Sequence, residues 1–442
     1  MKKIKNLSEA SFLKLFFAFL TACFLVAAVC MPDRATMFTG LWQILSQPAK
    51  ISTNYFHLGG YAATFLNMGL VGLCFLVLML VLKAAPNNVT TFGFILTIGF
   101  SSWGINALNI WPTIFGVMGY CLVKNEKFGA NVNAMLFSTG IAPIISELLV
   151  RYPNAEVVGF NVVGILLALL VGYGIGFLLP AGLGHAPAVH KGFDLYSAAV
   201  PICFMAFFLN ATLYKTMGID LPAVTSDMAV ASQLTVNIFC VVVFVLCIVF
   251  AWLLGCRPKD YWQLLSAKDH VASVSGKLGN ATFLMNVGIY GLFILAYYNV
   301  IGANFNGITF GIIFCMLCCA NSGSHPGNVW PIMAGYVLFS LAFGWFSEAL
   351  GGNFAQTINA QAICVGLCFA NGLSPVASKY GWGWGIVAGG LHYLLVTSVP
   401  NMHGGYCLYN GGFTAAVICL LLVPQLERFC KTKQERLAAK QK

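Results

Sequence analysis

Charge is scarce in this sequence, because Asp, Glu, Lys and Arg make up only 8% of its 442 residues, against about 25% in soluble domains. Hydrophobic residues reach 59%. Long hydrophilic inserts are also missing, and the longest such stretch between apolar segments runs from residue 257 to residue 277. These absences exclude an ordinary soluble protein and predict a multi-pass membrane protein.

Signatures of catalysis and of nucleic-acid binding are absent as well. The sequence has no His-Glu-x-x-His pair, nucleophile elbow, phosphate loop or carboxylate pair, so we expect no enzyme, no cofactor and no bound metal. The net charge of +10 forms no basic stripe with interleaved aromatics, so we expect no nucleic-acid partner. The 16 cysteines lack framework spacing, and we interpret even the cluster of Cys315, Cys318 and Cys319 as small apolar packing.

Apolar segments follow one another from residue 12 to residue 425 and predict an all-α integral membrane protein. Most approach the ~20 residues that a membrane-spanning helix needs. Two segments, 91–103 and 307–321, are shorter, and each leads into an uncharged connector rich in Gly, Ser and Asn. Each predicts either a re-entrant hairpin or a pair of tilted full spans. We expect ten full spans and two hairpins, or fourteen crossing segments if there are no hairpins.

An internal duplication covers most of the chain. Six blocks recur in the same order, matching Asn67 with Asn286, Thr91 with Thr309, Asn109-Ile110-Trp111-Pro112 with Asn328-Val329-Trp330-Pro331, Asn133 with Asn359, Gly140 with Gly372, and His190 with His403. The blocks divide the chain into an N-terminal helix and loop (1–53), a first repeat (54–228), a linking helix and loop (229–275), a second repeat (276–425) and a basic tail (426–442).

Lys and Arg gather on one side of the expected membrane. If the N-terminus lies inside and every segment crosses, 19 of the 23 basic residues fall inside and 4 fall outside. Cytoplasmic loops are enriched in Lys and Arg, so we predict that both termini are cytoplasmic. The first repeat then begins outside and the second begins inside. The two repeats are therefore inverted, which is typical of secondary transporters.

Polar residues of the connectors and of the recurring blocks are the candidate solute ligands, because Asn and Ser can replace the water shell of a solute. We predict that Asn109 and Asn328 approach one another near the bilayer centre, since each precedes a Trp-Pro at a helix start. The alternative is that each Asn only caps a helix at the membrane surface. The full candidate set is Asn67, Asn106, Asn109, Trp111, Asn133, Ser146, Asn286, Ser322, Ser324, Asn328, Trp330, Asn359 and Ser378.

Two further pairs of blocks predict gating or structural roles. Pro143 and Pro375 lie within apolar segments, where each removes a backbone donor and either breaks the helix at a binding site or kinks it for packing. The two His-x-Gly-aromatic-x-Leu-Tyr blocks fall on opposite sides of the membrane in the predicted topology, which suits gates or structural anchors of loops. Their candidate residues are His190, Tyr196, His403 and Tyr409.

The Asn-x-Trp-Pro and His-x-Gly-aromatic-x-Leu-Tyr blocks carry a resemblance over nearly the whole chain. Through these blocks the chain resembles a bacterial membrane protein family whose members carry a domain of unknown function twice. This resemblance implies a location in the bacterial inner membrane. The sequence is also remotely similar to urea transporters, which place Asn-Pro-Leu-Ser-Gly before a repeated apolar segment. Here Leu66-Asn67-Met68-Gly69 and Met285-Asn286-Val287-Gly288 hold that place but lack the Pro.

The most consistent interpretation is a transporter for a small polar solute, neutral or anionic, with its site at the interface of the repeats near the midplane. A channel of the same architecture is the alternative, and a membrane-embedded enzyme or an assembly scaffold is a rival from another class. The expected partners are the solute and the lipid bilayer. A sodium ion or proton as coupling ion and a homo-oligomer stay open.

Overall fold

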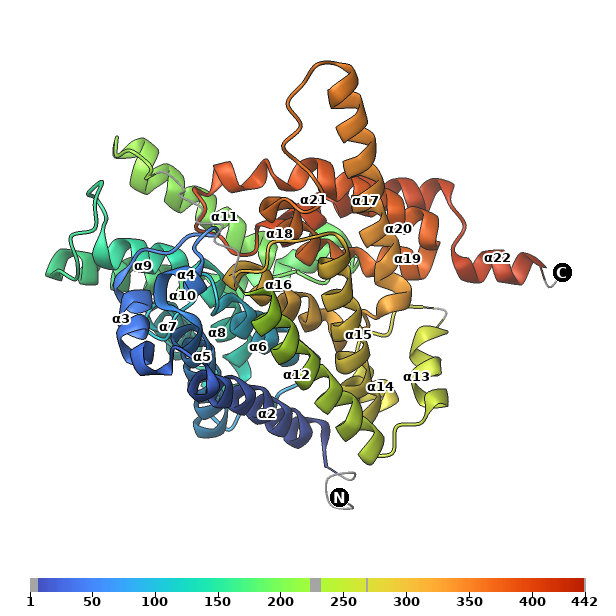
Figure 1. The fold of residues 1–442 in the computed structure, drawn as a ribbon, viewed down its shortest axis with the longest axis horizontal. Coiled ribbons are helices and arrows are strands. Elements are labelled where there is room, and N and C mark those ends of the chain that lie inside the picture. The colour runs from blue at the N-terminus through green and yellow to red at the C-terminus, as the bar shows by residue number, and fades with distance from the viewer. Residues whose placement is uncertain (1–6, 223–231, 268, 441–442) are drawn as a thin grey trace.

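The computed structural model describes residues 7–222, 232–267 and 269–440, and helices are the only regular elements within these ranges (Figure 1). The predicted all-α class is confirmed. Among the basic residues counted as cytoplasmic, Lys2, Lys3, Lys5, Lys268 and Lys442 lie outside the described residues, as does the predicted boundary at 228.

The first half of the chain forms one ordered series of helices. It consists of α2 (Glu9–Cys30), η1 (Arg34–Thr36), α3 (Met37–Ser46), α4 (Tyr55–Gly59), α5 (Tyr61–Val81), α6 (Asn88–Phe100), α7 (Trp111–Lys124), η2 (Phe128–Asn131), α8 (Val132–Ser138), η3 (Thr139–Ile141), α9 (Ala142–Val150), α10 (Val162–His190), and α11 (Ala199–Asn210), which continues as the π-helical turn η4 (Ala211–Thr216).

The second half repeats this order. It consists of α12 (Gln233–Leu253), α13 (Pro258–Leu265), α14 (Val274–Leu278), α15 (Asn280–Val300), α16 (Gly307–Leu317), η5 (Cys318–Ala320), α17 (Pro326–Ala349), α18 (Gln361–Ala370), η6 (Asn371–Leu373), α19 (Ser374–Tyr380), α20 (Trp382–Val396), η7 (Val399–Met402) and α21 (Asn410–Phe429), followed by α22 (Lys433–Lys440).

Equivalent helices in the two halves pack in equivalent ways. Helix α2 packs along α5 as α12 packs along α15, and α7 packs along α10 as α17 packs along α20. The short helices α4 and α14 both end at a glycine with positive φ, Gly60 and Gly279, which lets the chain turn sharply into α5 and α15. The repeated structural unit therefore includes α2 and α12, which the sequence boundaries at 54 and 276 leave outside.

Ten helical stretches in the described ranges are long and apolar enough to cross a membrane. Exposed side chains on α10, α12 and α17 are largely apolar, and Leu170, Leu234 and Trp345 are each at least 65% exposed. This surface suits lipid and belongs to a multi-pass membrane protein. The short segments predicted at 91–103 and 307–321 are confirmed as α6 and α16, with 13 and 11 residues.

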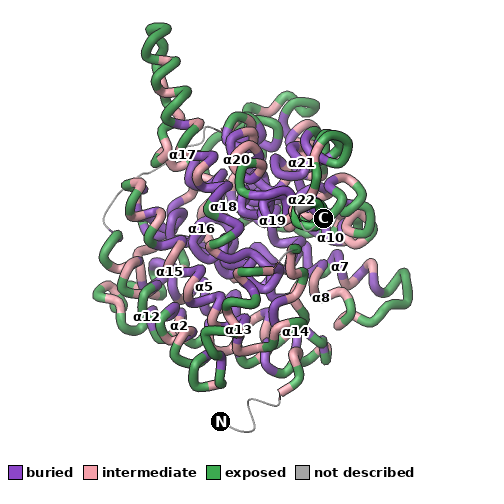
Figure 2. Tube along the Cα trace, turned by 90° about the vertical axis from the view of Figure 1, so that its right-hand side faces the viewer, coloured by how far each residue is buried: buried purple, intermediate pink, exposed green. Residues whose placement is uncertain are grey.

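Two lengths differ from the sequence-based expectation. The segment 329–345, expected to be half of a hairpin, belongs to the 24-residue helix α17, whose far end projects from the body of the protein (Figures 1 and 2). The segment 382–399, expected to span fully, forms α20 with only 15 residues. The length of an apolar run alone does not determine the length of either helix. Helix α17 continues beyond residues 329–345 at both ends, and the chain after α20 turns into η7.

Helices α6 and α16 begin with the same local chemistry. The side chain of Asn87 accepts a hydrogen bond from the Thr90 backbone N–H at 3.1 Å, and the side chain of Asn306 accepts one from the Thr309 N–H at 3.0 Å. Each Asn thereby satisfies a backbone donor that a helix start leaves unpaired. Both helices are buried almost throughout, and both lie near the middle of the protein (Figure 1).

These two helices run antiparallel to one another. Near the end of α6, the Ser102 hydroxyl donates to the carbonyl oxygen of Gly307 at the start of α16, at 2.7 Å. At the other end, the Asn321 side-chain amide donates to the Thr91 hydroxyl at 3.3 Å. Between these contacts the backbones nearly touch, because a Cβ on Gly99 would lie 2.8 Å from the carbonyl oxygen of Gly311. Glycine at both positions permits this approach.

A matched pair of glycine substitutions tests the crossing. In Gly311→Ala the new Cβ overlaps the carbonyl oxygen of Gly99, so we expect a loss of about 1–3 kcal/mol and a lower apparent melting temperature of the purified protein. Gly174→Ala in α10 is the control, since no heavy atom lies within 4 Å of its added Cβ. Equal melting temperatures for the two variants would contradict the close crossing.

Candidate functional site

The connector after α6 is held by the candidate asparagines of the first repeat. The Asn67 side-chain amide donates to the carbonyl oxygens of Ser101 and Ile105, at 2.7 and 2.9 Å. The Asn109 amide donates to the carbonyl of Gly104 and to the Ser146 hydroxyl, both at 3.0 Å. The structure therefore brings Asn67, Asn109 and Ser146 together, and Asn106 joins them through its backbone N–H, which donates to Asn109.

The connector after α16 is held in the same way. The Asn286 amide donates to the carbonyls of Ala320 and Ser324, at 3.0 and 2.9 Å. The Asn328 amide donates to the Gly323 carbonyl at 2.9 Å and to the Ser378 hydroxyl at 3.1 Å. In both connectors these amide donors bond to the protein itself, so the asparagines fold the connectors.

The prediction that Asn109 and Asn328 meet near the bilayer centre is wrong. Each follows the end of its short helix, and α6 and α16 pass beside one another antiparallel. The two connectors therefore lie at opposite ends of this helix pair. The 13 residues of α6 correspond to a separation of roughly 20 Å at ~1.5 Å rise per residue.

The remaining predicted ligands form no further cluster, although Trp111 adjoins the first connector, where the Ala107 backbone N–H donates to the Asn67 side chain at 3.1 Å. Trp111 donates its ring N–H to the Ala107 carbonyl at 2.9 Å, and Trp330 is 42% exposed and stacks on Trp382. Asn133 is half-buried and Asn359 is exposed. Ser322 is buried next to the second asparagine cluster in the chain. The structure does not bring these five together.

The two proline blocks form breaks in helices. A 3₁₀ turn, η3, separates α8 from α9, and a second, η6, separates α18 from α19. Pro143 and Pro375 stand in the first turn of α9 and α19, where a missing backbone N–H costs nothing. The structure therefore contains a helix break at each proline block, and the binding of a solute there stays a prediction.

Each histidine loop fills the helix break of the other repeat. The backbone N–H of Leu195 donates to the Gly372 carbonyl at 3.1 Å, and that of Leu408 donates to the Gly140 carbonyl at 2.8 Å. A Cβ on either glycine would overlap the ring of Tyr196 or Tyr409 respectively. These loops are anchors between the repeats.

The two histidines hold the shape of their loops. The His190 ring lies 2.6 Å from the Ser197 hydroxyl and accepts from the Gly192 N–H at 3.2 Å. The His403 ring accepts from the Cys407 N–H at 3.1 Å. Both interactions are local, as expected for structural histidines.

The Tyr196 hydroxyl lies among three oxygen atoms that belong to α16, α18 and η6. It lies 3.2 Å from the carbonyl of Cys315, 3.1 Å from that of Cys368 and 2.9 Å from the side-chain oxygen of Asn371. The Asn371 amide in turn donates to the Met316 carbonyl at 2.8 Å. A single tyrosine proton is thus shared among three acceptors, which ties α16 to α18.

The equivalent tyrosine in the other break is unsatisfied. The Tyr409 hydroxyl and the Trp103 ring N–H are fully buried and have no hydrogen-bond partner among the described residues. Both rings pack on Phe100, with centroids 5.4 and 5.2 Å away. Two unpaired donors on one buried aromatic ring are unusual, since buried polar groups are normally paired. Trp103 is not among the residues predicted from the sequence. The available signal was an aromatic side chain with a hydrogen-bond donor in an uncharged connector.

Two carboxylates are buried within the described ranges, Glu147 and Asp194. Glu147 accepts two bonds from the Arg151 guanidinium, at 2.8 and 2.6 Å. Asp194 takes part in no ion pair found in these ranges. The described residues contain no group of three His, Cys, Asp or Glu side chains able to hold a metal ion.

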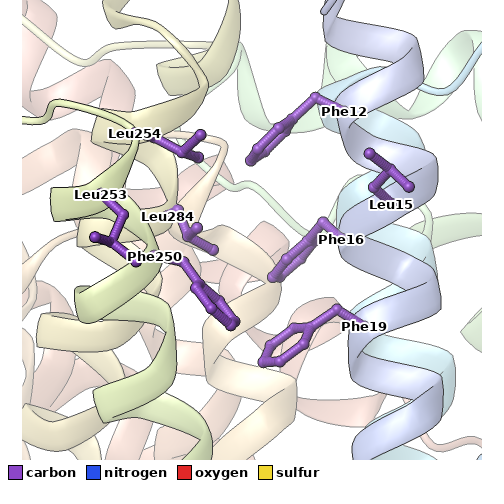
Figure 3. Close-up of a pocket in the computed structure, with 8 residues that line it drawn as sticks. All are labelled: Phe12, Leu15, Phe16, Phe19, Phe250, Leu253, Leu254 and Leu284. Atoms are coloured by element: carbon purple, nitrogen blue, oxygen red, sulfur yellow. The ribbon is translucent and has the colours of Figure 1, made fainter. Parts of the chain in front are cut away.

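A groove between α2 and α12 is a poor candidate for a polar solute. Its volume is ≈ 320 Å³, and phenylalanine and leucine side chains face one another across it (Figure 3). The lining residues are Phe12, Leu15, Phe16, Phe19, Phe250, Leu253, Leu254 and Leu284. These side chains offer no hydrogen bond, so the groove suits lipid chains.

Residues 33–215 and 259–428 match the model of a family described as proteins of unknown function, DUF1576. The chain belongs to this family. The two DUF1576 stretches run from η1 to α11 and from α13 to α21, so the predicted family with a duplicated domain is confirmed. No curated protein and no solved structure matches the chain, and the likeness to urea transporters has no support from these comparisons.

The two tyrosines offer a matched test of this geometry. Tyr196→Phe should lower stability by about 1–3 kcal/mol, because it leaves buried acceptors unpaired. Tyr409→Phe should leave the apparent melting temperature unchanged or raise it, because its hydroxyl has no partner among the described residues. Thermal unfolding of both purified variants checks the asymmetry. Equal losses would contradict it.

Proposed function

We propose that this protein is a carrier that moves a small polar solute, neutral or anionic, across the bacterial inner membrane. One observation carries the proposal: two buried, half-length helices run antiparallel through the centre, flanked by broken helices. Broken helices at the interface of inverted repeats are the architecture in which secondary transporters bind substrate.

Inverted insertion of the two repeats is part of the proposal. The antiparallel contacts between α6 and α16 and the 19-to-4 distribution of Lys and Arg support it. Both termini are then cytoplasmic. In this scheme each short helix enters the membrane part-way, and the chain returns through α7 in the first repeat and through the longer α17 in the second. The burial of α6 and α16 supports that assignment, because irregular backbone at membrane depth requires cover by protein.

The solute site in this proposal lies at Trp103 and Tyr409. Two neutral donors favour a solute that presents an acceptor oxygen, whether uncharged or anionic. The near contact of backbones at Gly99 and Gly311 leaves no open path along the crossing, which favours a carrier that changes conformation over an open channel. The connector asparagines then act as scaffolding.

Topology is tested by labelling a single cysteine at Ser266. This residue is exposed after α13 and is cytoplasmic in the proposal. In a background without native cysteines, Ser266→Cys should resist an impermeant thiol reagent added to intact cells and react after permeabilisation. Cysteine at Asn353 in the exposed loop after α17 is the matched control and should react from outside. The opposite pattern would reverse the proposed orientation.

Solute movement is tested with the purified protein in liposomes, using urea, glycerol, lactate and phosphate as probes. At least one should raise the apparent melting temperature, since ligand binding stabilises the folded state by mass action, and should enter the vesicles. Trp103→Phe should weaken its binding about tenfold or more, as expected from the loss of one buried hydrogen bond.

The control for that loss is Trp330→Phe, which changes an exposed tryptophan. It should leave binding unchanged. Uptake that is equal in wild type and Trp103→Phe would move the solute site elsewhere, and an absence of uptake of any small polar solute would overturn the carrier itself.

A further inference from the structure

Asp194 lies in the loop between α10 and α11 and is only 2% exposed. One carboxylate oxygen accepts the backbone N–H of Tyr196 at 2.9 Å. The other oxygen is buried and has no hydrogen-bond partner among the described residues. The carboxylate also presses on the helix break, because a Cβ on Gly372 would lie 2.8 Å from it.

This position does not stabilise an ionised carboxylate. Burial without a cation strongly favours the protonated acid, whereas the equally buried Glu147 has the Arg151 guanidinium. Burial raises the pKa of Asp194 to about 7, partly opposed by the bond from the Tyr196 N–H. A carboxyl with this pKa is protonated below neutral pH and ionised above it.

The charged groups around this loop are engaged elsewhere. Lys191 pairs with Glu427 of α21 at 2.6 Å, and the ammonium of Lys379 in α19 lies 5.0 Å from the ring centre of Phe193. From α21 the buried thiol of Cys419 faces Asp194. The His190 ring bonds within its own loop. None of these supplies an ion pair to Asp194 within the described residues.

Tyr196 connects Asp194 to the centre of the protein. Its backbone N–H bonds the carboxylate, and its hydroxyl lies within 3.2 Å of the carbonyls of Cys315 in α16 and Cys368 in α18. A change of charge on Asp194 alters its bond to this loop, and the loop in turn holds the two helices together.

The equivalent position in the other loop is not acidic. Counting from His190 and His403, Asp194 corresponds to Cys407, whose buried sulfur lies 2.9 Å from that of Cys203. Only one of the two anchors therefore carries a carboxyl group. In the proposed topology it is the anchor on the cytoplasmic side.

We propose that Asp194 binds and releases the proton that couples solute movement to a proton gradient, an inference that rests on the carrier function proposed above. A carboxyl that is buried by protein, with one oxygen unpaired among the described residues, is a ready proton site. Sodium is the alternative coupling ion, and the experiment below distinguishes it from the proton.

Infrared titration of the purified protein in lipid nanodiscs tests the proton site without any solute. The C=O stretching band of a protonated carboxyl should disappear as the pH rises, with a midpoint near pH 7. The band should be absent in Asp194→Asn and retained in Glu348→Gln, a carboxyl-to-amide change at an exposed residue of α17. If Asp194→Asn fails to fold, Asp194→Glu should shift the band in frequency.

Three results would overturn the proton site: no band titrating near neutral pH, the same band in Asp194→Asn, or its loss on adding sodium at constant pH. Coupling is then measured in liposomes loaded with a pH-sensitive dye. The panel solute with the highest wild-type uptake should carry protons inward, and Asp194→Asn should lose gradient-driven accumulation at least tenfold while keeping solute exchange.

The outcomes separate the two proposals. If Asp194→Asn still accumulates solute along a proton gradient, the coupling role is wrong and the carrier stands. If wild type moves no solute while the infrared band titrates as expected, the carrier is wrong and the proton site stands.

Discussion

The close approach of two helix backbones in the middle of the protein is the constraint on which the other features depend. Helices α6 and α16 are too short to cross a membrane, and their ends need cover because unpaired backbone groups are costly in lipid. Gly99 and Gly311 let the two lie against one another. The asparagine-held connectors close one end of each helix, and the surrounding long helices screen both from lipid.

The breaks beside this crossing are closed by exchange between the repeats. Each repeat contributes a loop whose tyrosine fits over a glycine in the other, so the interface is formed by reciprocal insertion. The exchange is unequal in its chemistry. The Tyr196 hydroxyl lies within hydrogen-bond distance of two backbone carbonyls, whereas the hydroxyl of Tyr409 has no partner among the described residues. A duplicated scaffold thus carries different polar chemistry in its two halves.

The sequence predicted those features that depend on composition, local residue type and internal repetition. Membrane class, helical fold, duplication, the short helices and the proline breaks follow from such patterns. The prediction that Asn109 and Asn328 approach one another was wrong. No sequence pattern within one segment reveals whether two short helices meet at their ends or pass side by side. Trp103 and Asp194 were missed for a related reason: whether a polar group is left unpaired depends on neighbours distant in the chain.

The reciprocal loops also impose an order on biosynthesis. The break at Gly140 is made early, but Tyr409, which covers it, is translated 269 residues later. At ~5–20 residues per second, that delay is roughly 15–50 s. Throughout this interval the first half stands in the membrane with an uncovered break. The nascent protein must therefore be sheltered, by lipid, water or the insertion machinery, until its last long helix is in place.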